Sequence, residues 1–179
     1  MGRIYTRTGD DGNTVLTGGE RVSKNSPAIE AVGAVYELNA LIGIVRCHSL
    51  PVDIDRLLQL IQEQLFVAGA DLAAADGKGR GNGGIGDAAI IRLENEIDAI
   101  ENSLSPLRKF IFPGGSPAGA HLHYACAVAR RAERRCVAMA AGAGVAPEIL
   151  RYMNRLSDLL FVLARSVNQR DSIPERNST

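Results

Sequence analysis

The first 25 residues hold the densest set of groups suited to binding phosphate. Residues 6–14 carry threonine hydroxyls, two glycines, an arginine and an asparagine, and a lysine follows shortly after. Hydroxyls, exposed backbone amides and cations are the groups that surround phosphate oxygens. No predicted strand precedes the segment, so it is neither a P-loop nor a dinucleotide-binding turn, and an ordinary turn-rich arm is the alternative. The candidate ligands are Thr6, Arg7, Thr8, Gly9, Asn13, Thr14 and Lys24.

A second cluster of charges lies in an alanine-rich helical segment, where residues 130–135 read Arg-Arg-Ala-Glu-Arg-Arg. Arg130 and Arg134 are four residues apart, so a helix places them on one face, and Glu133 is three residues from Arg130. Guanidinium groups arranged in this way can hold a polyphosphate. The alternative is a solvated face on which the arginines pair with Glu133. The candidate ligands here are Arg130, Arg131, Glu133 and Arg134.

A third cluster places Asn154, Arg155 and Asp158 among residues typical of a buried helix face. Asn154 and Asp158 share one face because they are four residues apart. Polar groups that interrupt a buried face need partners, which either neighbours in the protein or a ligand can supply. Both interpretations stay open for this cluster.

Patterns for other kinds of catalysis are missing from the sequence. His121, His123 and Cys126 are metal-ligand types, but a two-residue step puts the histidines on different sides of a helix, so no metal site is expected. There is no nucleophile elbow and no convincing pair of carboxylates. An enzyme built from these clusters would depend on positioning and charge neutralisation more than on proton transfer.

Five helical segments must position these groups. Apolar residues recur at three- and four-residue steps over about residues 27–47, 51–72, 87–104, 118–141 and 147–169. The pair Ser26-Pro27 is typical of a helix start. With almost no strand pattern, we predict one all-α domain over residues 1–179, a five-helix bundle with an ordered N-terminal loop. Its other parts are an arm at 1–25, a glycine-rich loop at 75–86 and a flexible tail at 171–179.

Composition limits the classes of partner. Twenty basic and twenty acidic side chains cancel, so no strong field favours nucleic acid or an anionic membrane surface. Aromatic residues make up 4% of the chain, too few for stacking single-stranded nucleic acid. No apolar run approaches the roughly 20 residues of a membrane-spanning helix. The three cysteines are widely spaced and odd in number, which favours reduced thiols. We therefore expect a cytoplasmic protein that binds neither nucleic acid nor membranes.

Taken together, the clusters resemble one family, the ATP:cob(I)alamin (corrinoid) adenosyltransferases of the propanediol-utilisation type. Five strings occur in the family's order and approximate spacing over nearly the whole chain. Each string alone is common, but five in register are specific. They are Arg-Ile-Tyr-Thr-Arg-Thr-Gly-Asp-Asp-Gly at 3–12, Glu-Leu-Asn at 37–39, Phe-Ile-Phe-Pro-Gly-Gly at 110–115, Arg-Arg-Ala-Glu-Arg at 130–134 and Asn-Arg-Leu-Ser-Asp at 154–158.

The resemblance implies a ferritin-like five-helix bundle of the cobalamin adenosyltransferase type, assembled as a homotrimer with each site between two subunits. It implies that cobalt(I) of a reduced cobalamin attacks the 5′ carbon of Mg²⁺-bound ATP and expels triphosphate, whose charge is spread over Lys24, Arg130 and Arg134. Phe110 matches an aromatic residue that faces the corrinoid and removes the lower axial ligand of cobalt. An electron-donating reductase and a B12-dependent enzyme are implied as partners. By position, the ATP-binding residues are Thr6, Arg7, Thr8, Gly9, Asn13, Thr14, Lys24, Arg130, Arg131, Glu133, Arg134 and Asn154.

Two positions depart from the family pattern. Tyr36 stands where the family usually has aspartate, and Cys126 where it usually has arginine. In the family these residues form a salt bridge across the subunit interface, and replacing both partners is less costly than losing one. We predict that Tyr36 and Cys126 approach each other across that interface. The departure keeps open a second function, a non-catalytic protein that binds ATP or corrinoid, and a third, a plain helical interaction protein.

Overall fold

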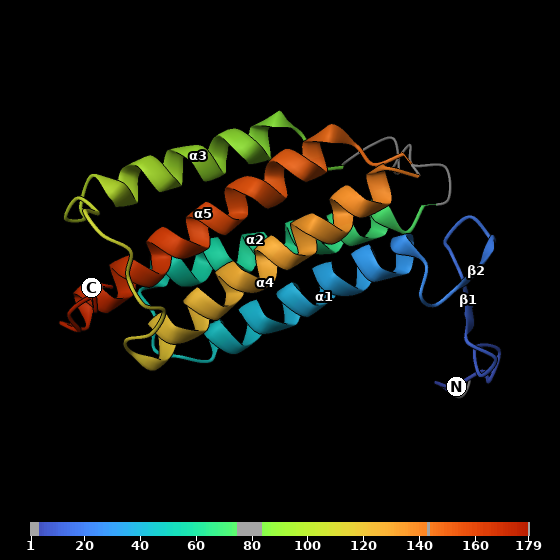
Figure 1. The fold of residues 1–179 in the computed structure, drawn as a ribbon, viewed down its shortest axis with the longest axis horizontal. Coiled ribbons are helices and arrows are strands. Elements are labelled where there is room, and N and C mark those ends of the chain that lie inside the picture. The colour runs from blue at the N-terminus through green and yellow to red at the C-terminus, as the bar shows by residue number, and fades with distance from the viewer. Residues whose placement is uncertain (1–3, 75–83, 143, 179) are drawn as a thin grey trace.

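The computed structural model describes residues 4–74, 84–142 and 144–178, and five helices within them form a bundle (Figure 1). Helix α4 lies against α1 and α5, α1 also contacts α2, and α3 lies along α5. The prediction of an all-α five-helix bundle is confirmed. The helices are α1 (Pro27–Arg46), α2 (Val52–Leu72), α3 (Asp87–Glu101), α4 (Pro117–Ala140) and α5 (Pro147–Arg170).

Two of the helices begin at a Ser-Pro pair, which explains where they start. The hydroxyl of Ser26 accepts a hydrogen bond from the backbone N–H of Ile29 at 3.4 Å, and the hydroxyl of Ser116 accepts one from Gly119 at 3.2 Å. Proline at the first helical position loses no hydrogen bond, because an amide at that position has no partner inside the helix. The pair Ser26-Pro27 therefore predicts the start of α1 correctly.

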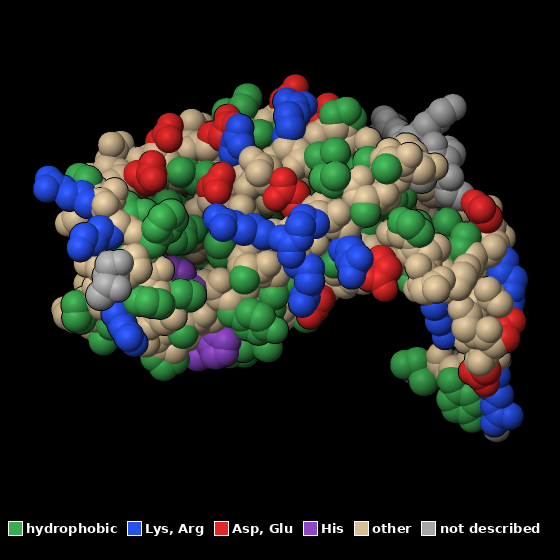
Figure 2. Space-filling view, in the orientation of Figure 1, with side chains coloured by type: hydrophobic (Ala, Val, Ile, Leu, Met, Phe, Trp, Pro, Cys, Tyr) green, Lys and Arg blue, Asp and Glu red, His purple; other side chains and the backbone are tan. Residues whose placement is uncertain are grey.

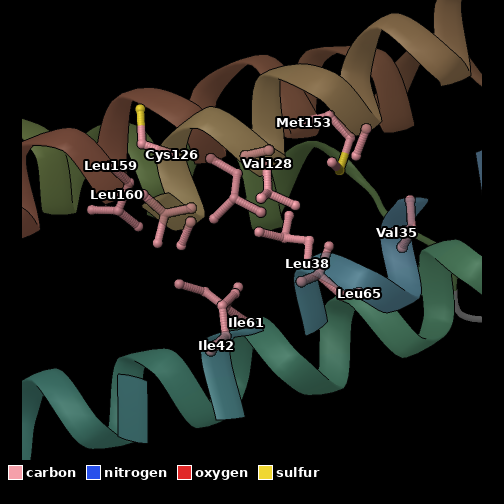
Figure 3. Packing of buried hydrophobic residues seen from close by; sticks show 14 of the residues in the cluster. Val35, Leu38, Ile42, Ile61, Leu65, Cys126, Val128, Met153, Leu159 and Leu160 are labelled. Carbon is pink, nitrogen blue, oxygen red and sulfur yellow. The ribbon is translucent and has the colours of Figure 1, made fainter. Parts of the chain in front are cut away.

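Apolar side chains from α1, α2, α4 and α5 fill the centre of the bundle (Figure 3). Leu38 and Ile42 of α1 face Ile61 and Leu65 of α2, with Leu160 of α5 above them, and all five are fully buried. Burying one such side chain stabilises the fold by about 1.5–3 kcal/mol relative to leaving it in water. The core therefore fixes which faces of α4 and α5 turn toward solvent.

Helix α1 has the length and hydropathy of a membrane-spanning helix, so the expectation that no run reaches this length is wrong. Seven of its residues are buried inside the bundle. Its acidic residues Glu30 and Glu37 form ion pairs with Arg135 and Arg131 of α4. A helix that packs one apolar face in a bundle can pass the same length and hydropathy test as a membrane span, and α1 packs one face against α2 and α4.

The N-terminal arm projects from the end of the bundle where α1 begins (Figure 1). It contains a short antiparallel hairpin, in which Thr14 of β1 (Asn13–Val15) pairs with Val22 of β2 (Arg21–Ser23). The sequence predicts an ordered loop here, and the hairpin is a small addition to it. In Figure 2 the tip of the arm forms a hook that stands away from the helices. Its base is attached to the bundle, because Leu16 is buried and the N–H of Thr17 donates to the carbonyl of Ala73 at the end of α2, at 3.1 Å.

Two further predicted segments are the glycine-rich loop and the tail. Of the loop at 75–86, residues 75–83 lie outside the described part of the chain. The tail, predicted to be flexible, hydrogen bonds to the connection before α4. The N–H of Phe112 donates to the carbonyl of Arg176, and the N–H of Ser178 donates to the carbonyl of Phe110, both at 2.8 Å. Residues 173–178 therefore lie against that connection rather than free of the bundle.

Candidate functional site

An open pocket lies between α4 and α5, and we call it the arginine pocket. Its volume is about 400 Å³. The core positions its residues, because Ala129 and Ala132 of α4 and Met153 and Leu156 of α5 are fully buried beside them. Figure 2 shows basic side chains gathered across the middle of this face, over α4 and α5. The lining residues are Arg130, Glu133, Arg134, Val137, Asn154, Ser157 and Asp158.

Arg130 and Arg134 are exposed and form no ion pair with a carboxylate in the part of the chain that the structure describes. The solvated-face alternative needs pairs with Glu133, whose carboxylate instead accepts a hydrogen bond from the Asn154 amide at 3.1 Å. The oxygen of that amide accepts a hydrogen bond from Arg155 at 2.7 Å. Two guanidinium groups are therefore left to bind an anion such as a phosphate chain.

A second groove, of about 330 Å³, lies between α1 and α4 and contains the other two arginines of the cluster. Arg131 pairs with Glu37 at 2.5 Å, and Arg135 pairs with Glu30 at 3.4 Å. Lys24 also lines this groove. Because carboxylates already neutralise Arg131 and Arg135, the groove attracts an anion less strongly than the arginine pocket does.

The predicted phosphate-binding residues of the arm form one turn next to Lys24. The ammonium group of Lys24 donates to the carbonyl of Gly9 at 2.7 Å, and a Cβ at Gly9 would lie 3.1 Å from it, so glycine permits the close approach. The hydroxyls of Thr6 and Thr8 hydrogen bond at 2.8 Å. Arg7 adopts φ 62°, a left-handed conformation that is unusual for this residue type and turns the segment.

Arg21 organises the arm, although it is not among the predicted site residues. It donates to the carbonyl of Thr8 at 3.2 Å and to the carboxylate of Asp11 at 2.7 Å. Hydrogen bonds from the backbone N–H of Asn13 and from Arg21 lower the pKa of Asp11 to about 2. Asn13 and Thr14 follow in β1. A hairpin predicted from the sequence would have placed Arg21 in the strand opposite this turn, and so would have identified it as a possible partner of the turn.

One chain alone does not bring the arm, the arginine pocket and Phe110 together. Thr6, Arg7 and Thr8 are exposed and are not among the residues that line the arginine pocket. Phe110 is 86% exposed. It lies in the connection between α3 and α4, at the end of the bundle opposite the arm (Figure 1). The predicted convergence of these groups therefore requires a neighbouring chain.

The expectation that Asn154 and Asp158 interrupt a buried face of α5 is wrong. Both side chains are exposed, whereas Met153, Leu156 and Ser157 beside them are buried. Each residue of a helix is turned by about 100° from the one before it, and four steps return nearly to the same face. Asn154 and Asp158 therefore share the edge of α5 that borders the arginine pocket.

Tyr36 and Cys126 have different surroundings within one chain. Tyr36 is 40% exposed and packs its ring near Phe66, with 6.3 Å between ring centroids. The ring also covers Gly69, where a Cβ would lie 2.8 Å from it. Cys126 is buried in α4, and burial raises the pKa of its thiol. Their approach across an interface concerns two copies of the chain and stays a prediction.

The two histidines of α4 have separate partners. Nδ1 of His121 lies 3.0 Å from Nε2 of His48, whereas His123 is buried with its ring edge-on to Phe161. Burial lowers the pKa of His123, and the charge of Glu175 opposes this shift. Within residues 4–74, 84–142 and 144–178 there is no group of three or more histidines, cysteines and carboxylates that could hold a metal ion.

Comparisons with known proteins agree on one family. The family model described as cobalamin adenosyltransferase matches residues 4–167. The chain is 44% identical over 164 residues to the corrinoid adenosyltransferase PduO of Citrobacter freundii, covering 91% of this chain but 49% of that protein, so it spans about half the length of that relative. It is 40% identical over 175 residues to the corrinoid adenosyltransferase of Bacillus subtilis (strain 168), covering 96% of this chain and 89% of that protein.

A solved structure resembles this fold over its whole length. It is a variant of the PduO-type ATP:corrinoid adenosyltransferase from Lactobacillus reuteri, complexed with cobalamin and ATP. The TM-score is 0.92 and the sequence identity 32%, and the match covers 98% of this chain and 99% of the other.

Proposed function

Because the chain belongs to the cobalamin adenosyltransferase family, we propose that it transfers the 5′-deoxyadenosyl group of ATP to the cobalt of reduced cob(I)alamin or a related corrinoid. The electron pair of cobalt(I) forms a bond to the 5′ carbon of ATP. The bond from that carbon to oxygen breaks, and triphosphate leaves with its electron pair. The Bacillus subtilis relative, which the chain matches over most of its length, bears this activity in its name.

The observation that supports this proposal most directly is the pair of unneutralised guanidinium groups in the arginine pocket. Arg130 and Arg134 have no carboxylate partner among the described residues, although two neighbouring arginines do. Negative charge grows on the triphosphate as it leaves, and fixed cations stabilise that charge more in the transition state than in bound ATP. The reaction transfers no proton, so the lack of a general base is no obstacle.

Magnesium would enter with ATP. Glu133 and Asp158 line the same pocket as the two arginines. Magnesium in nucleotide sites is usually held by one or two carboxylates together with substrate phosphates, so these residues fit that role. The ion would neutralise part of the phosphate charge.

We propose that the active form is a homotrimer in which the arm of one chain completes the arginine pocket of its neighbour. The tip of the arm stands clear of its own helices (Figure 2), and its candidate ligands Thr6, Arg7, Thr8 and Lys24 are exposed. The pocket on α4 and α5 is open. Phe110, which is almost fully exposed, would face the corrinoid. The ATP ligands would then be Thr6, Arg7, Thr8, Gly9, Asn13, Thr14 and Lys24 from one chain, and Arg130, Glu133, Arg134 and Asn154 from the other. Arg131, predicted with them, lies in the neighbouring groove and is paired with Glu37.

Mixing two inactive variants tests the shared site. Lys24→Ala removes a cation of the arm, and Arg130→Ala removes one from the pocket. A trimer that contains both variants has some sites built from the intact arm of one chain and the intact pocket of the other. Random co-assembly gives about a quarter of sites intact, so activity should reappear when the two are co-expressed. If each site drew on one chain only, no mixture would be active, and sedimentation analysis would check the trimer separately.

The direct test supplies the protein with ATP and chemically reduced cob(I)alamin. Formation of adenosylcobalamin with release of one triphosphate per turnover is the expected result. The second candidate function is a non-catalytic ATP- or corrinoid-binding protein, which Tyr36 and Cys126 favour because they replace the family's charged pair. Binding of both ligands by calorimetry with no product would support that function instead. A chain that bound neither ligand would be an interaction protein.

The proposed reaction also implies two partner enzymes, one that supplies its substrate and one that uses its product. Cobalt must arrive as cobalt(I), so an electron-donating reductase must act before the transfer, and a B12-dependent enzyme would use the product. All three cysteines are free thiols in the structure. Free thiols are typical of reducing compartments, so we propose a cytoplasmic location.

A further inference from the structure

The exposed ring of Phe110 sits on a connection that has little regular structure of its own. Residues 102–116, here called the Phe110 connection, join α3 to α4 and contain only one isolated β-bridge, at Ile111. Phe110 is 86% exposed, so the described part of the chain covers little of its ring. A side chain that must press against a ligand needs a fixed backbone. Something outside the connection must therefore hold it.

The segment at residues 173–178, here called the C-terminal segment, contacts the connection at Phe110 and at the two residues that follow it. The N–H of Ser178 donates to the carbonyl of Phe110, and the N–H of Phe112 donates to the carbonyl of Arg176, both at 2.8 Å. Ile111 forms an antiparallel bridge with Asn177. The guanidinium of Arg176 lies over the Phe112 ring, 4.8 Å from its centroid. These contacts between the two segments thus fix the backbone direction from which Phe110 projects.

Arg165 of α5 contacts both the C-terminal segment and the Phe110 connection. Its side chain is 5% exposed, and its Nε donates to the Glu175 carboxylate of the C-terminal segment at 2.6 Å. Its Nη2 donates to the carbonyl of Ser105, near the start of the Phe110 connection, at 2.8 Å. A buried guanidinium is costly unless its hydrogen bonds are made. Hydrogen bonds to these two partners, one in each segment, offset that cost.

Asn168, one turn further along α5, holds the other end of the connection. It is 5% exposed, donates to the carbonyl of Gly114 at 2.8 Å and accepts from the N–H of Ser116 at 3.0 Å. A Cβ at Gly115 or at Gly119 would overlap the Asn168 amide, and Gly115 adopts φ 113°. Because neither glycine has a Cβ, the Asn168 amide can approach the backbone at both positions closely.

We infer that the C-terminal segment, anchored by Arg165 through Glu175, is a positioning device that holds Phe110 in place for the corrinoid. This inference rests on the proposed function, because it takes the corrinoid as the ligand of Phe110. Arg165 is buried and would act on Phe110 through the backbone of the two segments that it contacts. The device is separate from the arginine pocket, whose lining includes none of its residues. Its loss should therefore impair the corrinoid step and leave ATP binding intact.

The test compares the wild-type protein with a variant that lacks residues 173–179, and with Glu175→Ala and Glu175→Gln. Glutamine keeps a hydrogen bond to Arg165, whereas alanine removes it. Arg170→Ala is the matched control, because Arg170 is also on α5 but bonds to Asp171 and to the carbonyl of Ser49. The measurements are the dissociation constant for ATP, kcat and KM with cob(I)alamin, and the optical spectrum of protein-bound cob(II)alamin, which reports axial ligation of cobalt.

The truncated protein and Glu175→Ala should bind ATP within about twofold of wild type but lose tenfold to about a hundredfold in kcat, as a displacement of about 1 Å can cause. Their bound cob(II)alamin should keep the spectrum of the free, axially ligated form. Glu175→Gln should recover most of the activity. The inference is overturned if the truncated protein keeps wild-type kcat and spectrum, or if ATP affinity and melting temperature fall together with activity. A wild-type protein that makes no adenosylcobalamin would instead refute the proposed function.

Discussion

Replacing Arg130 by alanine should weaken ATP binding sharply, because the structure leaves its guanidinium without a carboxylate partner among the described residues. A phosphate chain in the arginine pocket would be its first strong partner. The variant breaks no ion pair within the described chain, so the fold should not change. The decrease in ATP affinity therefore measures the contribution of Arg130 to ligand binding alone.

The expected size follows from the number of bonds that are lost. One hydrogen bond between charged groups contributes about 1.5–3 kcal/mol, and each 1.4 kcal/mol changes a dissociation constant tenfold, so Arg130→Ala should raise the dissociation constant for ATP by about 10- to 150-fold. Because Arg130 is exposed, solvent screening should put the measured value in the lower part of that range. Arg134→Ala should have a similar effect, since it lines the same pocket.

Calorimetric titration with Mg–ATP at physiological salt measures the effect, and Arg151→Ala is the control. That arginine lies on α5 but is already paired with Asp87 at 2.9 Å and Glu148 at 3.1 Å. Removing it changes the net charge by the same amount, yet ATP affinity should stay within about twofold of wild type. Equal losses in the two variants would show that long-range charge attracts ATP, and no loss in Arg130→Ala would remove the arginine pocket from the site.

Three further predictions concern other parts of the chain. Gly69→Ala should destabilise the protein by about 1–2 kcal/mol in urea unfolding, because a methyl group there displaces the Tyr36 ring. In a Tyr36→Ala background the same substitution should stabilise the protein by up to about 1 kcal/mol, because alanine favours helix. Equal effects of Gly69→Ala in both backgrounds would contradict this prediction. The free energy of unfolding should decrease as the pH falls below about 6.5, because unfolded chain binds a proton that buried His123 resists. That component, up to about 1.4 kcal/mol per pH unit, should vanish in His123→Gln, and parallel curves for the two proteins would refute it. In native protein a maleimide should label exposed Cys47 rapidly and the two buried cysteines only after unfolding, as mass spectrometry would count; labelling of all three at one rate would contradict the burial.

Sequence periodicity predicts the helices well because each depends mainly on local pattern and capping. It also places Arg130 and Arg134 on one face of α4. It does not predict which arginines remain unpaired, because Glu30 and Glu37 on α1, about a hundred residues earlier, neutralise the neighbouring pair. Contacts between helices far apart in sequence decide that outcome, and the three-dimensional packing is needed to find them.

The structures of the arm and of the tail are harder to predict from sequence than the helices, for different reasons. Gly18-Gly19 lies between two short β-prone stretches and is a recognisable hairpin signal, so β1 and β2 could have been predicted from it. The tail is polar, and its sequence predicts a segment without contacts to the bundle, because its partners are backbone groups of the Phe110 connection. Backbone partners leave no side-chain pattern in a sequence. The opposite charges of Arg165 and Glu175 are a sequence feature that is consistent with attachment of the tail to α5. They are ten residues apart, so no local pattern shows that they pair.

The distances along one chain explain why each sequence cluster is weak evidence by itself. Arg130 lies 13 residues after Pro117, the first residue of α4, which is about 20 Å along a helix. The arm leaves the bundle at one end, and the connection between α3 and α4, which contains Phe110, lies at the other (Figure 1). Within the described residues of one chain, the arm, the arginine pocket and Phe110 therefore lie apart, and each cluster taken alone resembles an ordinary turn, a charged helix face or an exposed ring. If the arm of a neighbouring chain supplies the missing contacts, the same residues that look dispensable within one subunit become necessary at the interface between two.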